Sequence, residues 1–166
     1  MNPDAEIVAL QLGRPPRGHW RVAVRCPHDR PCVISVAPLL EDGTPFPTTF
    51  WLTCPHLGEA VSKLESTGET AAWTDRIAGD AALTAAMTAA DAAYRVARAA
   101  EAGGADPVPS VGVAGQADPL VVKCLHARLA AFLAGIADPI GAAMPDGLRE
   151  SGAGTVCRDD RCGRAI

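Results

Sequence analysis

The stretch WRVAVRCPHDRPCVISVAP, residues 20–38, decides the fold that we expect for the chain. Its two arms, 20–26 and 32–38, are rich in β-branched residues that alternate with other types, and PHDRP separates them. This pattern is typical of two strands joined by a short turn. The segment TFWLT, residues 49–53, has the composition of a third strand. The N-terminal half therefore predicts a small antiparallel β-sheet.

The rest of the chain has helical character. Helices are predicted over 3–12, 56–67 and 80–102, with a further short one in TAAWTDRIAG, and 103–119 is predicted to be a long loop. The apolar stripe expected on 80–102 consists of Leu83, Met87, Tyr94 and an alanine at position 90 or 97. We expect several helices packed with the sheet in one α+β domain over residues 1–150. Residues 151–166 are predicted to be a polar, Gly-rich tail that holds Cys157 and Cys162.

Composition and charge exclude several classes of protein. With 166 residues, 48% of them hydrophobic, and a mean hydropathy of +0.11, the chain is long and apolar enough to bury a core. A net charge of -4 gives no electrostatic case for binding nucleic acid. No uncharged apolar run is long enough for membrane insertion, and MNPDAEIVAL lacks the pattern of a signal peptide. We expect a cytoplasmic protein.

The six cysteines are the strongest chemical signal. Stable disulfides are not expected in a reducing compartment, and cysteines in Pro-containing turns favour metal binding or catalysis over packing. Cys26 and Cys54 each follow a predicted strand and precede a proline, which fixes the backbone beside a ligand. Since the compact Cys-x2–4-Cys pair of zinc fingers is absent, any ligands must come from separate elements. The sequence leaves open whether zinc or an iron–sulfur cluster would bind.

Cys124 and His126 lie where the stretch VVKCLHARLAAFLAGI, residues 121–136, begins a predicted helix. In a continuous helix, residues two positions apart point about 200° away from each other. His126 lies within the apolar arc, which favours a partly buried, hydrogen-bonded histidine, whereas Cys124 gains from the dipole of the helix N-terminus. We therefore predict Cys26, Cys54 and Cys124 as metal ligands, with a fourth from His126, Cys157 or Cys162. His126 qualifies only if the helix begins after Cys124.

Three other features have simpler interpretations. Cys32, in the returning strand, is expected to pack in the core or a turn. The tail segment CRDDRC is expected to be solvated. The segment GVAG, residues 112–115, fits no phosphate-binding motif and is only a weak signal for an anion cradle.

The motifs QLGRPPRG, RCP, EDGTPFPTTFWLTCP and VKCLHA resemble the bacterial family catalogued as domain of unknown function 501, from about residue 10 to about residue 140. The family pattern maps onto Cys26, Pro27, Pro45, Thr48, Trp51, Cys54, Pro55, Lys123, Cys124, Leu125 and His126. The chain departs from that pattern in PHDRPC after Cys26 and in GVAG. Family genes often lie beside a septum-formation initiator protein and an exopolyphosphatase-like protein. The resemblance thus implies a link, and a protein partner, in cell division or polyphosphate-related metabolism.

Four hypotheses follow from these observations. The first is a cytoplasmic protein that binds a metal ion or iron–sulfur cluster through dispersed cysteines. The second is a metal-dependent enzyme in which an open coordination position takes a substrate or water. The third is an interaction module with ordinary structural cysteines. The fourth is a thiol switch, in which Cys26 would pair with Cys32, or Cys157 with Cys162.

Overall fold

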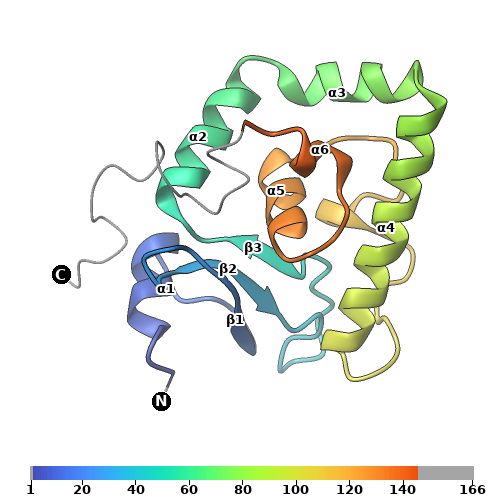
Figure 1. Cartoon of the computed structure of the whole chain (residues 1–166). Helices are drawn as coiled ribbons and strands as arrows, with labels where there is room; N and C mark the ends of the chain where they lie inside the picture. Colours follow the sequence, from blue (N-terminus) through green and yellow to red (C-terminus); the bar gives the residue numbers. More distant parts are fainter. Residues whose placement is uncertain (1, 146–166) are drawn as a thin grey trace.

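The computed structural model describes residues 2–145. The predicted domain boundary at residue 150 and the predicted tail with Cys157 and Cys162 lie outside these residues. Within the described part, the chain folds as the predicted combination of a small antiparallel sheet and several helices (Figure 1). None of the helices in this part is long and apolar enough to cross a membrane.

In residues 2–145 the sheet has three strands, in the order β1 (Trp20–Arg25), β2 (Pro31–Val36) and β3 (Phe50–Leu52). The hairpin expected from residues 20–38 is confirmed, since β1 and β2 pair antiparallel across the turn. The register shifts between Val22 and Val24, as at a β-bulge. β3 pairs antiparallel with β2, with Ile34 opposite Trp51. The third strand expected from TFWLT is therefore also confirmed.

The central strand β2 is buried at all six positions because both faces of the sheet are covered. On one face, Ile34 and Val36 pack with Val8 of helix α1 (Ala5–Leu12). On the other face, Val33 and Phe50 belong to the main core. Successive side chains of a strand point to opposite faces, so an entirely buried strand must be sandwiched in this way.

Three consecutive helices run around a central helix on the second face (Figure 1). They are α2 (Pro55–Ser66), α3 (Glu69–Ala78) and the long α4 (Ala81–Glu101). The central helix is α5 (Leu125–Leu133), followed by the single turn α6 (Pro139–Ala142). Where α5 and α6 meet, the Arg128 guanidinium lies 3.1 Å from the Asp138 carboxylate, and both side chains are buried. The same carboxylate accepts backbone hydrogen bonds from the start of α6.

The buried face of helix α4 contains charged residues in addition to the apolar residues that were predicted for it. Met87, Ala90 and Tyr94 are buried as predicted, but so are Asp91 and Arg98. Arg98 is completely buried and binds the Asp106 carboxylate with Nε and Nη2, at 2.9 and 2.8 Å. A helical pattern alone assigns such a residue to the solvent, whereas here its partner is brought in by the following loop.

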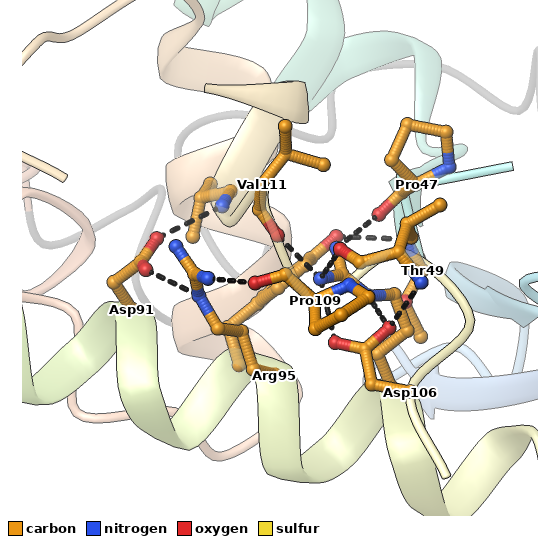
Figure 2. A network of polar contacts seen from close by, with 11 residues as sticks. Pro47, Thr49, Asp91, Arg95, Asp106, Pro109 and Val111 are labelled. Carbon is orange, nitrogen blue, oxygen red and sulfur yellow. Dashed lines mark hydrogen bonds and ion pairs between the residues drawn. The ribbon is translucent and has the colours of Figure 1, made fainter. Parts of the chain in front are cut away.

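The charged face of α4 holds the loop 103–119 in place (Figure 2). Arg98 also donates to the carbonyl oxygens of Pro47, at 2.9 Å, of Val108, at 2.9 Å, and of Val111. Asp91 accepts from the backbone N–H of Val113 in the short 3-10 turn η1 (Val113–Gly115). The predicted long loop therefore exists, and these contacts tie it to the chain just before β3.

Candidate metal site beside an apolar cleft

Cys124 and His126 lie on the same side of the molecule because helix α5 begins at Leu125. Cys124 is the residue before the helix, with an extended backbone (φ -146°, ψ 115°). The separation of about 200° that a continuous helix would impose does not apply to a residue outside the helix. The condition under which His126 was expected to join Cys124 is thus met.

Glu65, in the last turn of α2, completes the group. The metal-binding atoms of Glu65, Cys124 and His126 all lie within 4.8 Å of one another, and the three residues are half-buried. Glu65 Oε1 is 3.2 Å from His126 Nδ1. The same oxygen accepts a 2.7 Å hydrogen bond from the Leu125 backbone N–H, the first free donor of α5. Glu65 is therefore held by the helix start as well as by the histidine.

The second ring nitrogen of His126 is engaged by the backbone of α2. Nε2 lies 3.0 Å from the Gly58 carbonyl oxygen and 3.2 Å from Ser62 Oγ. Since a carbonyl oxygen only accepts, the hydrogen-bonded Nε2 carries a proton. In the neutral ring, Nδ1 is then the nitrogen with the free lone pair, and it faces Glu65. A backbone carbonyl that fixes the tautomer in this way is a usual support for a metal-binding histidine.

Without a metal, the surroundings of His126 favour the protonated ring. The hydrogen bond with Cys124, followed by the Gly58 carbonyl and the charge of Glu65, raises the pKa of His126 from 6.5 to about 9, against the opposing effect of burial. The site thus concentrates negative charge and lone pairs around one cation. The position that the Nδ1 proton occupies is the position that a metal ion would take.

An apolar cleft of about 420 Å³ lies directly beside Cys124 and His126. Its polar lining consists of Thr48, Lys123, Cys124 and His126. Its apolar lining consists of Leu12, Phe50, Trp51, Leu52, Ala114 and Ala127. A cleft of this size with a few polar groups at one side is typical of small-molecule sites. β3, α5 and the η1 turn each contribute to its wall, so the same loop that Arg98 holds in place also shapes the cleft.

The structure places the other predicted ligands elsewhere. Cys54, the residue before α2, is buried, and a hydrogen bond with the Cys32 side chain lowers the pKa of its thiol to about 6 despite that burial. Cys32 is a core residue, as predicted. Cys26 is half-buried in the hairpin turn. Its backbone N–H donates to the Arg30 carbonyl oxygen, and its own carbonyl oxygen accepts from the Asp29 N–H. Cys157 lies outside the described residues.

Within residues 2–145, Cys26, Cys54 and Cys124 do not form a group whose metal-binding atoms all lie within 4.8 Å of one another. The described residues therefore contain no cysteine cluster of the kind that an iron–sulfur centre needs. Cys124 is instead gathered with His126 and with Glu65, which the sequence did not single out. The sequence signal that could have found Glu65 is its place four residues after Val61, which is buried on the inward side of α2.

The GVAG segment binds an internal anion. The carboxylate of Asp91 accepts the Val113 N–H at 3.2 Å. A Cβ added at Gly112 would lie 1.6 Å from Asp91 Oδ1, so the carboxylate occupies the space that a side chain there would need. The anion beside the GVAG segment is therefore the carboxylate of Asp91. We assign no external ligand to this segment.

The fold and the site define an α+β protein with a candidate Glu–Cys–His metal site beside an apolar cleft. The chain belongs to the family described as protein of unknown function (DUF501), whose model matches residues 22–146. The matched range contains all three residues of the candidate site. No curated protein and no solved structure gives a significant match.

Proposed function

We propose that the protein binds a divalent transition-metal ion, zinc in the first place, through Glu65, Cys124 and His126. The observation that carries the proposal is the convergence of a carboxylate, a thiol and an imidazole within 4.8 Å. Zinc accepts all three donor types, whereas an iron–sulfur cluster requires several thiolates. Donor atoms around one tetrahedral zinc lie roughly 3.3–3.8 Å apart, given bond lengths of about 2.0–2.3 Å. The 3.2 Å between Glu65 Oε1 and His126 Nδ1 is close to that range.

Preorganisation supports the same proposal. The Gly58 carbonyl sets the histidine tautomer, and the Leu125 N–H holds the glutamate oxygen. Cys124 directly precedes the first turn of α5, so its thiol and the His126 ring come from the same helix start. Three protein ligands with a fourth position left open are typical of catalytic rather than structural zinc sites. Because Cys124 and His126 also line the cleft, the proposed open position faces it.

Metal analysis of the full chain tests the proposal. Protein purified without chelators or an affinity tag is expected to hold about one zinc per chain, and the cobalt-substituted form is expected to show a sulfur-to-cobalt charge-transfer band. Cys124→Ser, His126→Gln and Glu65→Gln should each lose metal affinity by at least an order of magnitude, since each removes one donor. Cys26→Ser and Cys54→Ser are the matched controls, because each removes a thiol that lies outside the group.

The outcomes separate the hypotheses. If the controls lose metal as readily as Cys124→Ser, the ligands are the dispersed cysteines and not this group. If the wild-type chain binds zinc no better than Cys124→Ser, the metal proposal is wrong and an interaction module with structural cysteines is favoured. Cys157→Ser in the full chain tests the fourth position: an unchanged cobalt spectrum means that Cys157 is not a ligand. We place the protein in the cytoplasm, and the thiol form of Cys26, Cys54 and Cys124 supports this localisation.

A further inference from the structure

The cleft beside the candidate metal site has features that select a particular class of ligand. It lies at the edge strand β3, whose residues Phe50, Trp51 and Leu52 form much of its apolar lining, and its polar residues Lys123, Cys124 and His126 lie around the start of α5. The apolar lining would exclude water from a hydrocarbon or aromatic body. The polar side would fix the orientation of a single head group.

The charges at the polar side point to an anionic head. Lys123 lines the cleft, and in residues 2–145 no carboxylate forms an ion pair with its ammonium group. The chain's other lysine, Lys63, lies 3.6 Å from the Glu59 carboxylate on α2. A lysine that lines an apolar cleft and has no carboxylate partner among residues 2–145 attracts a negatively charged group, since an ion pair there is less screened than on an open surface.

A charge count then sets the size of that negative charge. A zinc ion carries +2, which the Glu65 carboxylate and the Cys124 thiolate cancel, while His126 bound through Nδ1 is neutral. Lys123 adds +1, so the metal-loaded site is neutralised by one monoanion. A phosphate monoester, which carries a charge near -2 at neutral pH, would leave one negative charge without a partner.

We propose that the cleft binds an amphipathic monocarboxylate, with its apolar body over β3 and its carboxylate between Lys123 and the open position of the metal. This inference rests on the proposed metal site. A carboxylate oxygen is also an ordinary zinc ligand, so one head group satisfies both partners. The apolar body sets the affinity: each methylene buried in the cleft strengthens binding on the order of fourfold.

Octanoate is the probe, titrated into zinc-loaded full-length protein by calorimetry and by the fluorescence of Trp51, which lines the cleft. We expect saturable binding, about fourfold weaker for each methylene removed, and a fluorescence change that is lost in Trp51→Phe. Lys123→Gln should weaken binding on the order of tenfold. Lys63→Gln is the matched control and should bind like the wild type. Octan-1-ol and octyl phosphate should both bind more weakly than octanoate.

Several results would overturn the inference. Octanol binding as tightly as octanoate, or octanoate binding that is unaffected by Lys123→Gln, rules out recognition of the carboxylate. Tighter binding of octyl phosphate overturns the charge count. Zinc content is measured on each sample: retained zinc with no octanoate binding refutes this inference alone. Octanoate binding of equal strength in the wild type and in zinc-free Cys124→Ser refutes coordination of the carboxylate by the metal, whereas zinc missing from the wild type refutes the proposed function itself.

Discussion

Replacing Arg98 by methionine should destabilise the protein by about 3–5 kcal/mol, the usual cost of removing one partner from a buried ion pair. Arg98 is fully buried, and its partner Asp106 is only 11% exposed, so little water can replace the lost contacts. The guanidinium makes two hydrogen bonds to that carboxylate and one to each of three backbone carbonyls. Methionine fills part of the volume but donates no hydrogen bond, so the carboxylate and the three carbonyls lose their bonds to the guanidinium. Asp106 Oδ1 and the Val108 carbonyl oxygen each keep one backbone N–H donor, from Val108 and Val111.

Urea denaturation followed by far-UV circular dichroism at pH 7 measures this change as a lower free energy of unfolding. Arg76→Met is the control, because Arg76 is half-exposed and its distance to Glu69 is 3.5 Å; it should cost less than about 1 kcal/mol. Arg98→Met combined with Asp106→Asn should recover part of the loss, since the unpaired charge is then removed. A cost for Arg98→Met as small as that for Arg76→Met would refute the role given to the buried pair.

The same pair has a defined pH dependence. The hydrogen bond from Arg98 holds the pKa of Asp106 below its ordinary value of 3.8. A carboxyl group whose pKa is lowered by folding stabilises the protein fully above its unfolded pKa, and that contribution is lost as pH falls through the folded pKa. The difference in stability between wild type and Arg98→Met should therefore be constant near neutrality and should narrow below about pH 4. A difference that narrows instead between pH 7 and pH 5 would contradict the assignment to Asp106.

Three further predictions concern other parts of the fold. Gly112→Ala should cost about 1–3 kcal/mol in urea denaturation, because its Cβ would overlap Asp91, whereas Gly58→Ala, a helical position with free space, should be neutral or stabilising. In metal-free protein, His126 should titrate by NMR near pH 9, and Cys124→Ala should move that value toward 6.5. Because folding raises this pKa, the stabilisation from His126 is complete below about pH 6.5 and is lost as pH rises to about 9; increasing stability over that range would contradict it. Mild oxidation with diamide should link Cys32 to Cys54, which share a hydrogen bond, before Cys26 to Cys32, as read by peptide mass spectrometry.

The hairpin and the third strand were predictable because their signal is local. Alternating β-branched residues around PHDRP specify a strand, a turn and a returning strand without reference to the rest of the chain. The helices over 55–66 and 81–101 were likewise readable from spacing and composition. The positions of helix ends carry a weaker local signal, and the candidate metal site depends on one of them, the start of α5.

The partners of the polar residues were not predictable, because they are distant in sequence. Cys124 and His126 lie on the same side only because the helix begins at Leu125 and leaves Cys124 outside it. The Glu65 oxygen that accepts the hydrogen bond from the Leu125 N–H is 60 residues away in sequence. Cys54 was expected beside Cys124, but its thiol bonds Cys32 of the neighbouring strand. The burial of Arg98 depends on a loop carboxylate, for which a helical pattern carries no information.

The hydrogen bond between Leu125 and Glu65 has a consequence for the rate of the metal binding that we propose. The start of α5 needs an acceptor whether or not an ion is present, so the glutamate is already in position in the empty protein. At the proposed site, an incoming ion would need no refolding of the protein, and its association rate would be limited by diffusion, ligand deprotonation and the loss of its own water. Occupancy should leave the secondary structure of the protein unchanged.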